Sequence, residues 1–142
     1  SDYTQVAFWL KKTLREAGDK FTIVMMHHPV YSTAKGRQNP LMWLTFYGAM
    51  READVVFSGH DHNYARRTEY YKERFWKKEE PTVFISTNAS TKKYLVKENT
   101  TYEASLSGEA VYEYIFVTPT TLDVSTYNLH SGELIDKVEI IR

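Results

Sequence analysis

Two short stretches decide the fold of this chain: VMMHHPVY at residues 24–31 and DVVFSGHDHNYAR at residues 54–66. Each contains a short apolar run, which is typical of a strand buried on both faces, and each run is followed closely by histidines. Between them, Asn39-Pro40 is a helix N-cap followed by proline at the first helical position, and residues 41–53 continue the helix. Strand, helix and strand in this order predict a βαβ unit with two parallel strands.

The rest of the chain predicts a mixed α/β fold with a β-rich, mainly antiparallel tail. Residues 3–17 have the apolar spacing of an amphipathic helix, and Gly18 follows as a plausible stop. Pro81 precedes a predicted strand at 82–86. Alternating apolar residues separated by turn signals predict three further strands, at residues 111–118, 122–127 and 134–141. No linker or repeat interrupts residues 1–142, so we expect one domain or one piece of a domain.

The bulk composition narrows the possible partners. Lysine plus arginine equals aspartate plus glutamate at 18 each, so the net charge gives no reason to expect nucleic acid or a membrane surface as a partner. The absence of cysteine excludes disulfides and cysteine-based zinc sites. No apolar segment has the length needed to span a bilayer. The first residues lack a signal-peptide pattern and an initiator methionine, so we expect a fragment of a longer protein.

Four histidines lie where the two inner strands end. His27 and His28 follow the first strand, and His60 and His62 follow the second. Ligands in α/β sheets bind outside the carboxyl ends of the strands, and neutral imidazole is the commonest metal ligand. If the backbone is extended here, His60 and His62 project to the same side. A His-x-His pair also arises by chance, but the convergence of two histidine groups predicts a metal site.

Both stretches resemble the last two motifs of the calcineurin-like metallophosphoesterases, in particular the purple-acid-phosphatase-like subgroup. Residues 27–31 match His-x-Pro-x-Tyr, and residues 59–66 match Gly-His-x-His-x-Tyr-x-Arg. The resemblance covers the first half of the chain well and the β-rich tail only generally. It implies that residues 1–142 are the C-terminal half of the four-layer αββα sandwich of such a domain.

The resemblance also implies a ligand set and a reaction. His27 and His60 would bind a second metal ion and His62 a first. Softness favours Fe, Zn or Mn for such sites. Two such ions generate a hydroxide that hydrolyses phosphate mono- or diesters.

Three further residues are expected to bind the substrate. His28 lies beside a ligand, and Lys35 and Arg37 form a basic loop whose arginine can fork onto phosphate oxygens. The alternatives are a local role for His28 and a solvated surface loop for the other two residues.

Neighbouring residues of the two motifs are expected to support the site rather than to react. Tyr31, Tyr64 and Arg66 would pack and brace the loops. Asp61 would point away from the metals, in a supporting or purely solvated role.

The first three motifs of the family, Asp-x-His, Gly-Asp-x-x and Gly-Asn-His-Asp/Glu, are missing from this sequence, because its one Gly-Asp, at Gly18-Asp19, follows a predicted helix and not a strand. They supply the remaining metal ligands, so the chain holds no complete catalytic set. We expect one metal ion or none on the chain alone and no useful phosphoesterase activity. The exposed sheet edge would be covered by the missing N-terminal half or by a second copy.

The alternative is a non-catalytic structural or binding module with vestigial histidines. Residues 66–80 interleave basic and aromatic side chains, which could stack on single-stranded nucleic acid or bind a protein partner. Glutamates within the same stretch cancel much of that charge, so nucleic-acid binding is not expected.

Overall fold

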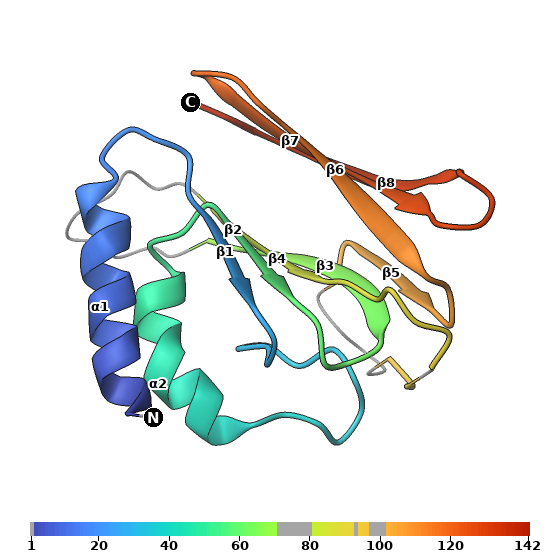
Figure 1. Cartoon of the computed structure of the whole chain (residues 1–142), viewed down its shortest axis with the longest axis horizontal. Helices are drawn as coiled ribbons and strands as arrows, with labels where there is room; N and C mark the ends of the chain where they lie inside the picture. The colour runs from blue at the N-terminus through green and yellow to red at the C-terminus, as the bar shows by residue number, and fades with distance from the viewer. Residues whose placement is uncertain (1, 71–80, 93, 97–101) are drawn as a thin grey trace.

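The computed structural model describes residues 2–70, 81–92, 94–96 and 102–142. These residues form three layers, namely a pair of helices, a five-stranded sheet and a three-stranded sheet (Figure 1). The elements are α1 (Tyr3–Glu16), β1 (Ile23–Met26), α2 (Pro40–Met50), β2 (Val55–Ser58), β3 (Asn63–Glu69), β4 (Thr82–Ser86), β5 (Ala104–Ser107), β6 (Val111–Val117), β7 (Thr121–Asn128) and β8 (Leu134–Ile141). The predicted mixed α/β fold, with one βαβ unit and a mainly antiparallel tail, is confirmed. Neither of the two described helices has the length and apolar character needed to cross a membrane.

The βαβ unit brings the ends of β1 and β2 to the same edge of the sheet, as both arrowheads in Figure 1 show. The two strands pair in parallel, with Met26 opposite Ser58 at their last residues. The connecting helix α2 begins where the sequence predicts it. The Asn39 side chain accepts hydrogen bonds from the N–H groups of Leu41 at 3.1 Å and Met42 at 3.3 Å, which satisfies two donors of the first helical turn.

The five-stranded sheet has the order β1-β2-β4-β3-β5, in which β4 is parallel to β2 while β3 is antiparallel to both β4 and β5. The sequence did not predict β3 or β5. Residues 63–69 read Asn-Tyr-Ala-Arg-Arg-Thr-Glu and lack apolar alternation, so pairing with two neighbouring strands places them in the sheet. Residues 66–69, interpreted as the start of a charged aromatic segment, are therefore strand. Residues 71–80 of that segment lie outside the described residues.

Apolar side chains pack on both faces of the central strands. Val56 of β2 packs against the helices, whereas Val55 and Phe57 pack against the three-stranded sheet. The buried residues of the helix-side core are Ala7, Leu14, Val24, Val30, Met42, Phe46, Met50, Ala53, Val56 and Phe84. Those of the core between the sheets are Val55, Phe57, Tyr64, Val83, Ile85, Val111, Leu122, Val124 and Ile140. The predicted burial of the second inner strand on both faces is confirmed.

The prediction of double burial is wrong for the first inner strand, because β1 lies at the edge of the sheet. Met25 is 75% exposed, and Phe8 of α1 and Leu44 of α2 are 73% and 70% exposed. A cavity of about 260 Å³ opens beside Met25 and reaches Glu113 of β6. Burial raises the pKa of the Glu113 carboxyl. Within the described residues, β1 therefore presents an exposed apolar side chain and an unpaired strand edge.

A carboxylate of β8 joins the two sheets. Asp136 accepts hydrogen bonds from the Tyr64 hydroxyl at 2.7 Å and from Nε and Nη2 of Arg66 at 2.6 and 3.1 Å. Burial alone would raise the pKa of Asp136, but the hydrogen bonds from Arg66 and Tyr64 lower it below its ordinary value. Tyr64 and Arg66 are expected to brace the loops, and the structure instead shows them as a clamp between β3 and β8.

We predict that Asp136→Asn destabilises the protein at neutral pH by about 2 kcal/mol, because an amide cannot accept all three hydrogen bonds. The folded-state pKa of Asp136 is depressed, so its contribution is present above the ordinary carboxyl pKa and is lost as the pH falls through the lowered value. Urea unfolding from neutral to about pH 3 should show a steeper acid loss for the wild type than for the variant. Asp19→Asn, at an exposed position, is the control. Equal stabilities of Asp136→Asn and wild type at neutral pH would contradict the clamp.

Candidate metal centre

The parallel pairing of β1 and β2 places His27 and His60 at the same edge of the sheet. Because Met26 and Ser58 are paired, the loops that follow them start side by side. The Gly59 N–H donates to the His27 carbonyl at 3.1 Å and ties the two loops together. The ring centroids of His27 and His60 are 5.3 Å apart. Two side chains separated by more than thirty residues thus meet because the strands that precede them are paired in register.

A third imidazole joins this pair. The His28 ring lies 4.9 Å from that of His27 and 4.4 Å from that of His60, measured between centroids. One ligand atom from each of the three histidines lies within 4.8 Å of the other two. His27 and His28 are exposed and His60 is half-buried. We call His27, His28 and His60 the histidine cluster.

His62 does not point to the cluster, and the expectation that it shares a side with His60 is wrong. That expectation required extended backbone, whereas His60 and His62 have φ values of 63° and 49°. In this left-handed region the period of two is lost. The His62 Nδ1 instead lies 2.9 Å from Ser90 Oγ, and its ring contacts that of Tyr94 at 5.2 Å. Each such backbone conformation costs roughly 1 kcal/mol or more, and such strain gathers at functional sites.

Arg37 contacts the cluster at His60. Its Nη2 lies 2.7 Å from His60 Nε2, and because arginine only donates, Nε2 must be the accepting nitrogen. Burial, followed by the charges of Arg37 and His28, lowers the pKa of His60, although Asp61 acts in the opposite direction. The Nε2 of His60 thus carries a lone pair that faces Arg37, and a ring nitrogen with a lone pair is the one that binds metals.

An aromatic side chain supports Arg37 from its other side. The guanidinium lies 4.2 Å from the centroid of the Tyr94 ring, and Lys92 Nζ lies 5.2 Å from the same ring. The hydrogen bond from Lys92 lowers the pKa of Tyr94, and the charges of Lys92 and Arg37 act in the same direction. Sequence reasoning missed Tyr94 and Ser90, because nothing in the sequence around them marks a site.

Asp61 is fully buried and holds the loop after β1 against the turn after β2. Its Oδ2 accepts from Ser32 Oγ at 2.9 Å, from the Thr33 N–H at 2.6 Å and from the Ala34 N–H at 3.3 Å. Its Oδ1 lies 3.6 Å from Nε of Arg37. The supporting role expected for Asp61 matches this arrangement, and the solvated alternative does not.

The remaining predicted substrate residue lies at the surface. Lys35 is exposed, and its backbone N–H donates to the Leu95 carbonyl at 2.9 Å. Of the basic loop, the structure thus brings Arg37 into the site and leaves Lys35 at the surface.

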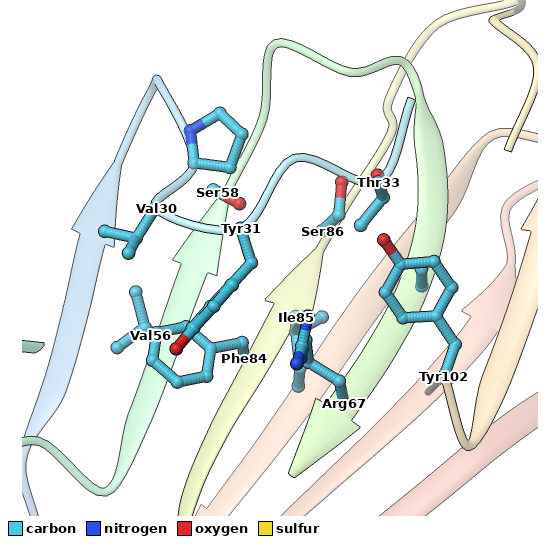
Figure 2. A pocket seen from close by; sticks show the side chains of 12 residues that line it. Val30, Tyr31, Thr33, Val56, Ser58, Arg67, Phe84, Ile85, Ser86 and Tyr102 are labelled. Carbon is cyan, nitrogen blue, oxygen red and sulfur yellow. The ribbon is translucent and has the colours of Figure 1, made fainter. Parts of the chain in front are cut away.

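A small pocket lies behind the loop that follows His27, and Figure 2 shows the side chains that line it. The Arg67 guanidinium stacks on Tyr31 at 4.2 Å, and the Tyr102 hydroxyl donates to the Ser32 carbonyl at 3.2 Å. Burial raises the pKa of Tyr102. At about 10 Å³ this pocket is the size of one water molecule. It braces the loop and has no room for a phosphate ester.

Residues 2–64 match the family model of the calcineurin-like phosphoesterases. The chain thus carries a calcineurin-like phosphoesterase segment. The family resemblance drawn from the two histidine motifs is confirmed. A comparison with curated proteins gives no match.

Two solved structures share the fold. One is GAP50, described as the anchor in the inner membrane complex of Plasmodium, with a TM-score of 0.73 and 18% identity over 96% of this chain. The other is purple acid phosphatase PPD1 from seeds of yellow lupin (Lupinus luteus), with a TM-score of 0.67 and 17% identity over 95% of this chain. The chain spans 42% and 28% of their respective lengths. At these identities the likeness shows a metallophosphoesterase fold and nothing about activity.

The donors of this calcineurin-like phosphoesterase segment suit a borderline metal ion such as Zn²⁺. The histidine cluster offers three imidazole nitrogens and, among the described residues, no carboxylate joins it. Imidazole suits Zn, Fe and Cu, whereas Mg²⁺ and Ca²⁺ require oxygen ligands. The residues therefore fit one ion at His27 and His60, with His62 turned elsewhere.

We predict that Asp61→Ala destabilises the protein by roughly 3 kcal/mol, because it leaves several buried donors without their acceptor and Arg37 without its ion-pair partner. Denaturant unfolding measures the loss, and Asp19→Ala at an exposed position serves as the control. A loss no larger than that of the control would show that Asp61 does not hold the loop.

Proposed function

We propose that the protein to which this chain belongs hydrolyses phosphate mono- or diesters with the help of two bound metal ions. The observation that carries the proposal is the convergence of His27 and His60 at the carboxyl edge of parallel strands, in a calcineurin-like phosphoesterase segment. Ligands bind at this edge in open α/β sheets. The chain spans less than half of each compared structure, so the proposed activity belongs to the whole protein.

In this proposal His27 and His60 hold the second ion and His62 contributes to the first. Ser90 faces Nδ1 of His62 at 2.9 Å, which leaves Nε2 as the nitrogen that a metal could use. Fe, Zn and Mn are the metals whose preferences suit imidazole with added oxygen ligands. When bound, two such ions activate a water molecule and withdraw charge from the phosphate oxygens.

The cationic side chains near the cluster would bind and orient the phosphate. Arg37 presents a planar fork that matches two phosphate oxygens, and Tyr94 stacks on its guanidinium. His28 is exposed beside the ligands and could donate to the same group. Lys35 is exposed and would add only long-range attraction for an anionic substrate.

The N-terminal half of the domain would complete the site. It would cover the β1 edge and the exposed Met25. A second copy of the chain could cover the same surface. Either partner would pair the free strand edge and remove apolar surface from water.

A non-catalytic structural or binding module is the second candidate. It is favoured by the contact of Arg37 with His60 Nε2, which blocks one proposed ligand atom, and by the shared fold of GAP50, described as an anchor. The nucleic-acid version is disfavoured, because Arg66 pairs with Asp136 and Arg67 with Glu69. The remainder of residues 66–80 beyond residue 70 lies outside the described residues.

We predict that His60→Ala in the complete protein lowers phosphoesterase activity by about 100-fold or more, because a ligand and the partner of Arg37 are both removed. The measurement is hydrolysis of p-nitrophenyl phosphate and bis-p-nitrophenyl phosphate after loading with Zn, Mn or Fe. His130→Ala, an exposed histidine in the β7–β8 turn, is the matched control. Activity that survives in His60→Ala would favour the non-catalytic module.

We predict that the chain alone self-associates or captures the separately produced N-terminal half, because no strand among the described residues pairs with the outer edge of β1. Sedimentation velocity measures both events. Met25→Lys should weaken association by placing a charge on the apolar strand surface, whereas Lys137→Met on β8 should not. A monomer that binds no N-terminal half would contradict this arrangement.

A further inference from the structure

We propose that His27, His28 and His60 form a site for a single Zn²⁺-like ion within this chain, and that Arg37 competes with the ion for His60. This ligand set differs from the one implied by the family motifs, which uses His62 and not His28. The site does not depend on the proposed phosphoesterase activity.

The geometry of the cluster suits one ion. Ligand nitrogens at the 2.0–2.1 Å distance typical of zinc lie about 3.3 Å apart in a tetrahedron. The cluster nitrogens already lie within 4.8 Å of one another. His27 and His28 are exposed, so side-chain rotation alone can close the remaining gap. Three imidazoles leave a fourth position open toward solvent, as in catalytic zinc sites.

His62 contacts Ser90 and Tyr94 and is not part of the histidine cluster. Its Nδ1 faces Ser90 Oγ at 2.9 Å and its ring packs against Tyr94. His28, in contrast, lies closer to His60 than His27 does, with centroid distances of 4.4 and 5.3 Å. The third ligand in the described residues is therefore His28.

Arg37 holds the place that the ion would take at His60. Its Nη2 approaches Nε2 of His60 at 2.7 Å, so a cation already rests on the lone pair. A metal ion can bind His60 only when this contact opens. The apparent affinity for the ion is thus lowered by the fraction of molecules in which Arg37 stays in place.

Asp61 can accept the Arg37 side chain when it leaves His60. Nε of Arg37 and Oδ1 of Asp61 lie 3.6 Å apart, and both are buried without a hydrogen-bond partner among the described residues. A short movement of Arg37 toward Asp61 would make this bond and release His60. The metal-bound state would thus gain a hydrogen bond between Arg37 and Asp61 that the metal-free state lacks, and this bond would compensate for the lost contact with His60.

The test is metal binding by the chain itself. The chain is stripped with a chelator and titrated with Zn²⁺ by calorimetry, and with Co²⁺ by visible absorption, which reports coordination geometry. We expect one ion per chain, with Mg²⁺ not competing. His28→Ala should weaken Zn²⁺ binding by about 10-fold or more, while His62→Ala and His130→Ala should change it by no more than about twofold.

Arg37→Met tests the competition. It keeps an apolar stem but removes the donors, and it should tighten Zn²⁺ binding by roughly fivefold or more. Lys35→Met removes an exposed charge from the same loop and should have little effect. Thermal unfolding confirms that each variant is folded.

Three results would overturn the proposal: no Zn²⁺ binding, two ions per chain, or a loss of binding in His62→Ala but not in His28→Ala. Unchanged affinity in Arg37→Met would overturn the competing role of the arginine. Inactivity of the complete protein would bear on the proposed phosphoesterase and leave these binding results unaffected.

Discussion

The buried carboxylate of Asp61 holds the site together. Its Oδ2 accepts hydrogen bonds from residues 32–34, which follow β1. Its own backbone lies in the turn after β2, between His60 and His62. An ionised carboxylate in a buried position requires such partners, because burial without them costs several kcal/mol. The same group lies beside Arg37 at 3.6 Å. Loop position, histidine orientation and the place of the arginine all follow from where this one charge is buried.

Two apolar cores fix the sheet that carries these loops. β2 and β4 are buried along their whole lengths, so neither strand can slip by one residue without exposing its core residues. The three-stranded sheet is attached on one side through Asp136, Tyr64 and Arg66. At β1 the described residues supply only one of the two covering faces. The carboxyl edge is therefore rigid at β2 and open at β1, beside the exposed His27 and His28.

The sequence was sufficient for those parts of the fold that local patterns determine. Apolar runs, the Asn39 cap and strand–helix–strand order predicted the βαβ unit and the meeting of His27 with His60. It was insufficient for β3 and β5, whose polar residues become strand only through pairing with neighbours. The His62 side chain points away from the cluster because its backbone has a left-handed φ, which no residue pattern predicts. The contact of Arg37 with His60 joins two loops and could not be read from either loop alone.

Charge balance decides how many ions this edge can hold. Two divalent ions about 4 Å apart repel each other by roughly 16 kcal/mol at an effective dielectric constant of about 20. Imidazoles are neutral and cannot offset this repulsion, and Arg37 and Lys92 add further positive charge nearby. Asp61, the buried carboxylate beside Arg37, already accepts hydrogen bonds from the loop after β1 and is not available as a metal ligand. A pair of ions therefore requires carboxylates brought by another segment or subunit, whereas one ion requires only that Arg37 move toward Asp61.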